Sequence, residues 1–157
     1  GIDPAGMRVA VLGAGGAARA AVYGLAQVEA RLVIVNRTPE RARELIDSLH
    51  IRATIGGFEA VADADLIVNC TSVGLSPSVD DSPLPDDSPL QPGVLAYDMI
   101  YRPAKTRFMQ QVEAAGGRAV GGLGMLVRQG AAAFALWTGI QPPLDVMFAA
   151  AQKELSG

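Results

Sequence analysis

Residues 11–20, VLGAGGAARA, decide the fold of this chain. They join the β-branched apolar run MRVAVLG (7–13) to the alanine-rich AARAAVYGLAQV, which predicts a strand, a tight turn and a helix. The loop reads Gly13-x-Gly15-x-x-Ala18. The first glycine permits the turn, the second lets the backbone approach a pyrophosphate, and the third position needs only a small side chain. The loop therefore predicts dinucleotide binding, although such turns also occur for structural reasons alone.

The rest of the chain repeats the alternation of strand and helix. RLVIVN at 31–36 indicates a second strand, and Thr38-Pro39 then supplies an N-cap and a first-turn proline for a helix over 39–50. Further strands are expected at 53–55, 65–70, 94–100 and 118–120, and helices at about 105–115 and 123–137. This pattern predicts a Rossmann-like α/β fold: a doubly wound, mostly parallel sheet with helices on both faces, in three α/β/α layers.

Composition limits the classes of partner. With 157 residues, half of them hydrophobic, the chain suits one domain over 1–157. A net charge of −3 with scattered Lys and Arg gives no basic field for nucleic acid or an anionic membrane. The single cysteine excludes an internal disulfide, and neither a membrane-spanning apolar run nor a signal peptide is evident. A cytoplasmic location is therefore expected.

The two ends of the chain and one internal segment depart from the pattern. The sequence begins at Gly1, so residues 1–6 are interpreted as a linker or remnant. Residues 140–157 are predicted to form a helix, packed on this domain or toward a missing one, because one helical stripe carries Leu144, Met147, Phe148, Ala151 and Leu155. In SPSVDDSPLPDDSPLQPG (76–93) the paired aspartates could ligate a metal, but the flanking Pro and Ser favour a solvated loop, and no metal is predicted.

The end of the second predicted strand bears on which dinucleotide is bound. NAD-binding domains usually place an Asp or Glu there to hold the ribose 2′-hydroxyl. This chain has Asn36-Arg37-Thr38, whose side chains can donate hydrogen bonds to a 2′-phosphate, and Arg41 could add a second cation. The pattern favours NADP over NAD. The alternative is that Arg37 is a solvated charge and Thr38 only a helix cap.

Several segments together resemble the C-terminal half of shikimate dehydrogenases. They are NCTSVGL (69–75), YDMIYRPAKT (97–106) and GGLGMLVRQGAAAFALWTG (121–139), and both GAGGAARA and NRT match the same family. The resemblance covers nearly the whole chain from Met7 onward. It implies an oxidoreductase that reversibly reduces 3-dehydroshikimate to shikimate with NADPH, a step of the shikimate pathway toward chorismate and the aromatic amino acids.

The resemblance also implies roles for individual residues. The pyrophosphate would lie on the glycine loop, formed by Gly13, Ala14, Gly15, Gly16 and Ala17. The adenosine 2′-phosphate would be held by Asn36, Arg37, Thr38 and Arg41. Thr71, Ser72 and Val73 would run beneath the nicotinamide ribose, Gly122 and Met125 would border the nicotinamide, and Tyr101 and Gln129 would reach the substrate.

Physical reasoning supports part of this assignment. Open α/β sheets bind ligands beyond the carboxyl ends of their strands, where Thr71 and Tyr101 are expected. Met125 and Gln129 are four apart in a helical segment and so share a face. Three of these residues also have an ordinary structural alternative: Met125 as core filler, Tyr101 as a cap on a strand end, and Gln129 as the partner of a buried carbonyl. His50 at a helix end and Cys70 at a strand end are interpreted as a solvent-facing residue and a small buried hydrophobe.

The chemistry of the family needs groups that this chain does not match. Shikimate dehydrogenases use a Lys–Asp pair, and hydroxyls that hold the substrate carboxylate, from a separate N-terminal domain. Neither Lys105 nor Lys153 matches the catalytic lysine, so no catalytic residue is assigned. The chain is expected to bind NADP without turnover, with shikimate bound through the missing domain and self-association left open. Two alternatives are a non-catalytic NADP(H)-binding regulatory module and the related nucleotide domain of a glutamyl-tRNA reductase.

Overall fold

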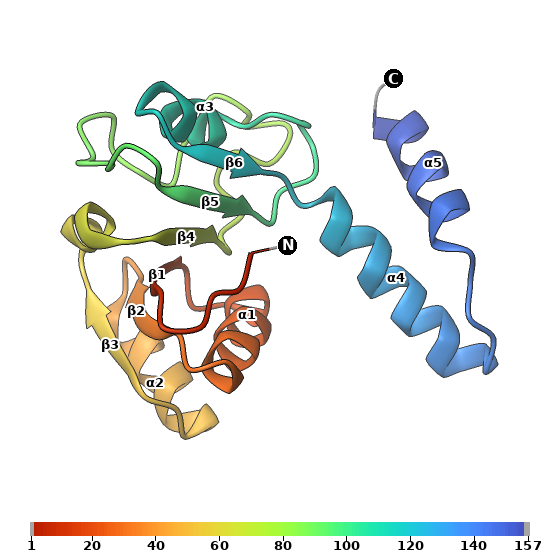
Figure 1. Cartoon of the computed structure of the whole chain (residues 1–157), viewed down its shortest axis with the longest axis horizontal. Helices are drawn as coiled ribbons and strands as arrows, with labels where there is room; N and C mark the ends of the chain where they lie inside the picture. The colour runs from red at the N-terminus through yellow and green to blue at the C-terminus, as the bar shows by residue number, and fades with distance from the viewer. Residues whose placement is uncertain (1, 156–157) are drawn as a thin grey trace.

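Six parallel strands form a single sheet in the computed structural model, which describes residues 2–155. Their order across the sheet is β3-β2-β1-β4-β5-β6 (Figure 1). The strands are β1 (Arg8–Leu12), β2 (Arg31–Val35), β3 (Ala53–Gly56), β4 (Leu66–Asn69), β5 (Leu95–Asp98) and β6 (Arg118–Val120). Two halves diverge from β1, since the chain moves outward to β3 and then returns to the other side of β1 at β4. This doubly wound order confirms the predicted Rossmann-like fold.

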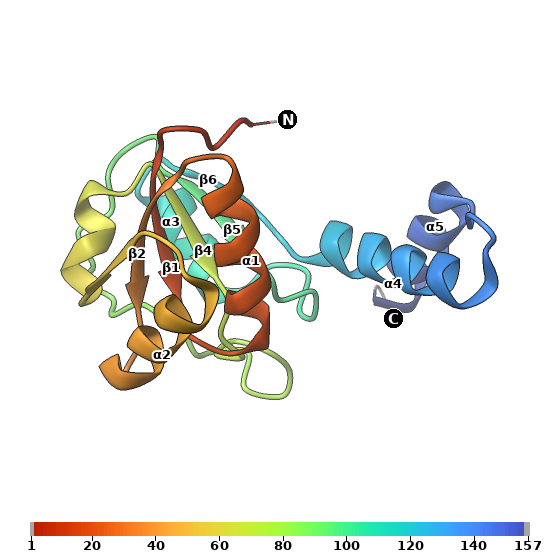
Figure 2. The same cartoon turned by 90° about the horizontal axis from the view of Figure 1, so that it is seen from below.

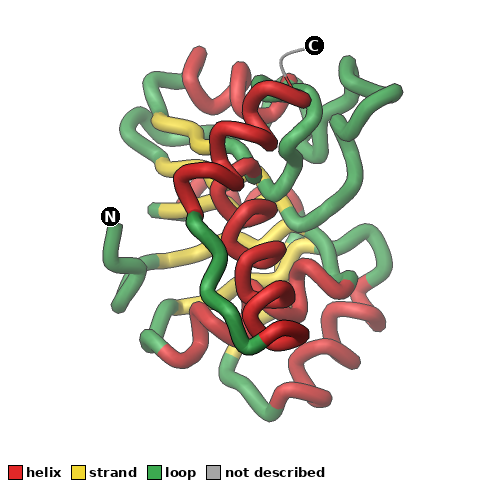
Figure 3. Tube along the Cα trace, turned by 90° about the vertical axis from the view of Figure 1, so that its right-hand side faces the viewer, coloured by secondary structure: helices red, strands yellow, loops and turns green. Residues whose placement is uncertain are grey.

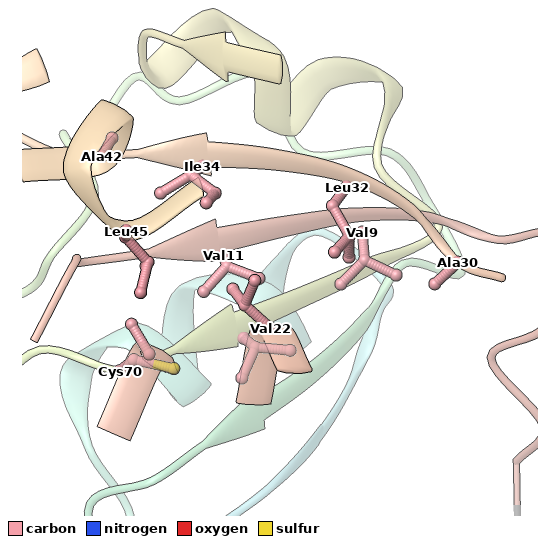
Figure 4. Packing of buried hydrophobic residues seen from close by; sticks show 11 residues of the cluster. Val9, Val11, Val22, Ala30, Leu32, Ile34, Ala42, Leu45 and Cys70 are labelled. Carbon is pink, nitrogen blue, oxygen red and sulfur yellow. The ribbon is translucent and has the colours of Figure 1, made fainter. Parts of the chain in front are cut away.

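Helices cover both faces of the sheet. On one face lie α1 (Gly16–Gln27) and α2 (Pro39–Leu49), and on the other lie the 3₁₀ helix η1 (Phe58–Asp63) and α3 (Arg107–Ala114) (Figure 2). Alternate residues of the inner strands feed the two cores. Val9 and Val11 of β1 pack with Val22 of α1, whereas Ala10 and Leu12 pack with the opposite helices (Figure 4). The continuous apolar strands are therefore explained by burial on both faces.

The last two helices form a pair that stands away from the sheet. The chain leaves β6 into α4 (Leu123–Thr138), turns at Gly139 and returns as α5 (Leu144–Leu155) (Figures 1 and 3). The Arg128 guanidinium lies 5.5 Å from the centre of the Phe148 ring, which joins the two helices. Large apolar side chains remain exposed on this pair, including Leu136 at 85% and Trp137 at 84%. We call α4 and α5 the helical hairpin.

The segment at 76–93 is a loop, as predicted, but it is anchored to the domain. Leu84 is buried in the same core as Phe108 of α3, on the face of the sheet that η1 and α3 cover. Arg107 donates from Nη2 to both carboxylate oxygens of Asp86, at 2.7 Å each. Asp86 is thus an ion-pair partner, and within residues 2–155 no cluster of His, Cys, Asp and Glu could hold a metal ion. None of the helices in that range is long and apolar enough to span a membrane.

Candidate functional site

The glycine loop makes its turn directly against two neighbouring strands. Gly13 has a φ of +105°, in the left-handed region, and its N–H donates to the Val35 carbonyl of β2 at 2.8 Å. A Cβ at Gly13 would lie 3.1 Å from Thr71 Cγ2 and 3.4 Å from the Cys70 backbone. Glycine is therefore required here both by the backbone conformation and by the close approach of the chain that follows β4.

The next two glycines instead face open space. Gly15 is the N-cap of α1 and has no side chain to cap it, and both Gly15 and Gly16 are exposed. An ideal Cβ on either residue would meet nothing within 4 Å in the described chain beyond its sequence neighbours and the backbone of its own helix. The first N–H groups of a helix lack partners within the helix and favour an anion. The loop thus fits a pyrophosphate, with bare backbone and a helix N-terminus presented to solvent.

Ala18 occupies the position where a glycine is more usual. Its side chain is fully buried in the core between α1 and the sheet, next to Val9 and Val22. Its burial between helix and strand fits the small residue that the sequence predicts at this position. Ala14 is half-buried and Ala17 exposed on either side of the two exposed glycines.

The carboxyl end of β2 presents two exposed cations. Asn36 Nδ2 donates to the Thr38 carbonyl at 2.8 Å and so shapes the turn. Thr38 is the N-cap of α2, but its hydroxyl makes no capping hydrogen bond. The Arg37 and Arg41 side chains are exposed and have no hydrogen-bond or ion-pair partner among residues 2–155. This arrangement leaves two guanidinium groups and a hydroxyl free to bind an anion beside the glycine loop.

Past β4, the three predicted nicotinamide-side residues lie in a turn organised by Asn69. The Asn69 Oδ1 atom accepts from the Thr71 N–H at 3.0 Å and from the Thr71 hydroxyl at 2.7 Å. The Thr71 hydroxyl oxygen in turn accepts from the Val73 N–H at 3.2 Å. Ser72 and Val73 are exposed and Thr71 is half-buried. The turn follows directly on β4, at the carboxyl end of that strand.

The start of α4 is packed against the end of β5. Gly122 donates its N–H to the Ile100 carbonyl at 2.8 Å, and a Cβ there would lie 2.2 Å from the Met99 oxygen. A side chain at Gly122 is therefore sterically excluded. Met125 follows one turn later and is half-buried. Burial raises the pKa of the nearby Tyr97 hydroxyl, and the Met125 backbone opposes that shift. Gln129 is exposed and Tyr101 half-buried, and neither side chain has a hydrogen-bond partner in the described part of the chain.

Sequence reasoning missed a buried polar pair beneath these loops. Asn69 and Asp98 are adjacent in the register of β4 and β5, both are fully buried, and Asn69 Nδ2 donates to Asp98 Oδ1 at 2.9 Å. Burial raises the pKa of Asp98 above its ordinary value, although hydrogen bonds from Thr106, Ile100 and Asn69 oppose that shift. One signal of this pair was present in the sequence, because each of the two apolar strands ends in a polar residue.

Three further titratable side chains singled out in the sequence have structural surroundings of their own, at the end of β4, on the loop before α3 and at the far end of α2. Burial and then the Asp98 charge raise the pKa of Cys70 to about 12, so its thiol stays protonated at neutral pH, as a small buried hydrophobe. Lys105 pairs with Glu113, and His50 is an exposed C-cap with a φ of +51°.

Two cavities lie elsewhere. One, of about 1150 Å³, opens at the amino ends of β1 to β3 between Arg31, Arg52 and Asp63, and the other, of about 630 Å³, lies between α4 and α5. No predicted site residue lines either of them.

Comparisons with known proteins connect this geometry to one family. Residues 3–76 match the family model "Shikimate / quinate 5-dehydrogenase", and residues 122–152 match "Shikimate 5′-dehydrogenase C-terminal domain". The shikimate dehydrogenase (NADP⁺) of Methanothermobacter thermautotrophicus is 41% identical over 160 residues, which cover 96% of this chain and 56% of that protein.

Solved structures agree. A shikimate dehydrogenase crystallised with NADP⁺ superposes with a TM-score of 0.85 at 31% identity, covering 95% of this chain and 55% of that one. The shikimate 5-dehydrogenase of Thermus thermophilus, in complex with NADP(H) and shikimate, gives a TM-score of 0.81 at 41% identity, covering 92% and 54%. The chain spans about half the length of the relatives it matches. It therefore corresponds to the NADP-binding domain region of the shikimate dehydrogenase family, in the C-terminal part of those proteins.

Proposed function

We propose that this chain forms the NADP site of a shikimate dehydrogenase, which reversibly reduces 3-dehydroshikimate to shikimate. The observation that carries the proposal is the end of β2, where Arg37 and Arg41 are exposed and unpaired beside the open glycine loop within the described residues. An NAD-specific site would place a carboxylate there, and a carboxylate would repel a 2′-phosphate. Bound NADPH would supply the hydride to the ketone.

The residues of this chain would bind and orient the cofactor. The backbone of Gly13 to Ala17 and the α1 N-terminus would hold the pyrophosphate. Asn36, Arg37, Thr38 and Arg41 would hold the 2′-phosphate, for which guanidinium groups are well suited. The nicotinamide side of the cofactor would lie against residues at the ends of β4 and β5 and at the start of α4: Thr71, Ser72, Val73, Gly122 and Met125.

Substrate binding would be shared between this chain and the rest of the protein. Tyr101 and Gln129 have polar groups without partners in the described chain, at the end of β5 and on α4, so they are free to reach a polyol. A proton donor is still needed for the reduced carbonyl oxygen. Lys105 is engaged with Glu113 and Asp98 is enclosed, which supports a donor outside this chain.

The helical hairpin also supports a site that is shared between this chain and the rest of the protein. Leu136, Trp137 and Ile140 expose large apolar surfaces, at 85%, 84% and 62%, a pattern typical of a surface that a partner covers. We propose that residues 140–157, of which the structure describes those up to 155, pack toward the additional length present in the relatives, and that the preceding part of the chain holds the cofactor. Without that length, self-association through the hairpin is the expected consequence.

Binding and turnover can be tested separately. Titration calorimetry of this chain should give tighter binding of NADPH than of NADH, and the chain alone should give no shikimate-dependent reduction of NADP⁺. The full-length protein should catalyse that reaction. Equal binding of the two nucleotides would overturn the cofactor assignment, and turnover by the chain alone would overturn the division of labour. Cofactor binding with no turnover by the full-length protein would instead favour a regulatory module.

A further inference from the structure

We infer that Asp98 is a positioning residue, whose carboxylate locks the loops after β4 and β5 together and thereby sets the nicotinamide half of the cofactor site. This inference rests on the proposed function, and it concerns a residue with no proposed contact to cofactor or substrate. The adenosine half of the site, built on β1, α1 and β2, lies outside the hydrogen bonds made by this carboxylate.

Each oxygen of the Asp98 carboxylate is used, and each bond ties down a different segment. Oδ1 accepts from Asn69 Nδ2 at 2.9 Å and from the Ile100 N–H at 3.0 Å. Oδ2 accepts from the Thr106 hydroxyl at 2.6 Å. The residue is fully buried, so water cannot replace these donors without a rearrangement.

Toward β4, Asn69 connects Asp98 to the turn that is predicted to lie beneath the nicotinamide ribose. Asn69 uses its amide N–H on Asp98 and its carbonyl oxygen on both the N–H and the hydroxyl of Thr71. Because the amide has one donor side and one acceptor side, Asp98 fixes which way Asn69 faces. Asp98 therefore determines that Asn69 presents an acceptor to Thr71, which in turn orders Val73.

Toward β5, the same carboxylate sets the loop that carries Tyr101 and meets α4. The Ile100 N–H is held by Asp98, while the Ile100 carbonyl accepts from Gly122 at the start of α4. Thr106 donates to Asp98 and accepts from the Met109 N–H as the N-cap of α3, so it closes the far end of the same loop. Every loop proposed to surround the nicotinamide is thus connected to one buried carboxylate.

The simplest test separates the two halves of the cofactor. 2′,5′-ADP carries the adenosine 2′-phosphate without the nicotinamide, and NADP⁺ carries both. Asp98→Asn keeps the shape of the side chain, but an amide nitrogen in place of Oδ2 cannot accept from Thr106. Calorimetry of this chain and the variant should give 2′,5′-ADP affinities within about twofold and an NADP⁺ affinity about tenfold lower in the variant, the equivalent of one charge-assisted hydrogen bond.

A matched pair covers the case in which Asp98→Asn does not fold. Thr106→Val removes the hydroxyl donor with little change in shape, and Thr106→Ser restores it. The valine variant should lower NADP⁺ affinity selectively, and the serine variant should recover it. Equal changes for both ligands, or no change for either, would overturn the positioning role. Failure of the parent chain to bind 2′,5′-ADP would instead contradict the proposed function.

Discussion

Gly13 and Thr71 approach each other across the boundary between β1 and β4, with only 3.1 Å between a Cβ on Gly13 and the Thr71 methyl carbon. This boundary is the point at which the strand order reverses, and ligands of doubly wound sheets bind there. The glycine loop and the turn after β4 are therefore parts of one packed unit, and their contact can be tested directly.

Gly13→Ala should destabilise the chain by about 1–3 kcal/mol, because alanine at a φ of +105° is strained and its methyl group crowds Thr71. Adding Thr71→Ser removes the crowding methyl but keeps the hydroxyl bonded to Asn69. The double variant should recover part of the loss in urea unfolding. Strict additivity of the two changes would argue against the contact.

Gly15→Ala should reduce NADPH affinity about tenfold while changing stability little, because its methyl group would point into space that only the cofactor is proposed to fill. Gly24→Ala is the matched control on the same helix, since Gly24 is also exposed and uncrowded. The control should leave binding intact and raise the free energy of unfolding by about 0.5–1 kcal/mol. Similar binding losses in both variants would refute this assignment.

Cys70 should make the chain less stable at alkaline pH. Its pKa is raised to about 12 in the fold, against about 8.5 for an unfolded thiol. Only the unfolded chain ionises between these values, so the contribution is fully present below about pH 8.5 and decreases by up to about 1.4 kcal/mol per pH unit above it. Urea unfolding of the parent and of Cys70→Ala, from pH 7 to pH 10.5 under reducing conditions, should show a steeper decline for the parent. Parallel curves would contradict the prediction.

Trp137 reports on whether the helical hairpin is covered in the longer protein. It is the single tryptophan of this chain and is 84% exposed, so acrylamide should quench its fluorescence nearly as efficiently as that of a free indole. In the full-length protein, with any other tryptophan replaced by phenylalanine, quenching of Trp137 should fall severalfold. Undiminished quenching of Trp137 in the full-length protein would show that the additional length does not cover the helical hairpin.

The order of strands and helices could be predicted because it depends on local sequence patterns. The predicted strand at 65–70 corresponds to β4 with one extra residue at each end, which is expected because strand boundaries depend on pairing with neighbours. The helix η1 over Phe58–Asp63 was missed, since its six residues carry no helical repeat long enough to detect.

The site divides in the same way. The glycine loop and Asn36-Arg37-Thr38 are each one continuous stretch of sequence, so a binding role for each could be proposed from local spacing alone. The pair formed by Asn69 and Asp98 could not, because they are 29 positions apart in the sequence and only the register of β4 and β5 brings them together. The exposed position of the helical hairpin was equally hidden, since its apolar stripe predicts burial without naming the surface that buries it.

Arg37 provides the most direct test of the central claim that this chain selects NADP through the end of β2. Arg37→Ala should weaken NADPH binding by about 10- to 100-fold in calorimetric titrations and leave NADH binding within about twofold, as expected for loss of a charge-assisted hydrogen bond to the 2′-phosphate. Arg43→Ala, which removes another exposed arginine from α2, should change neither affinity. Equal losses for both nucleotides in Arg37→Ala, or no loss for either, would contradict the account.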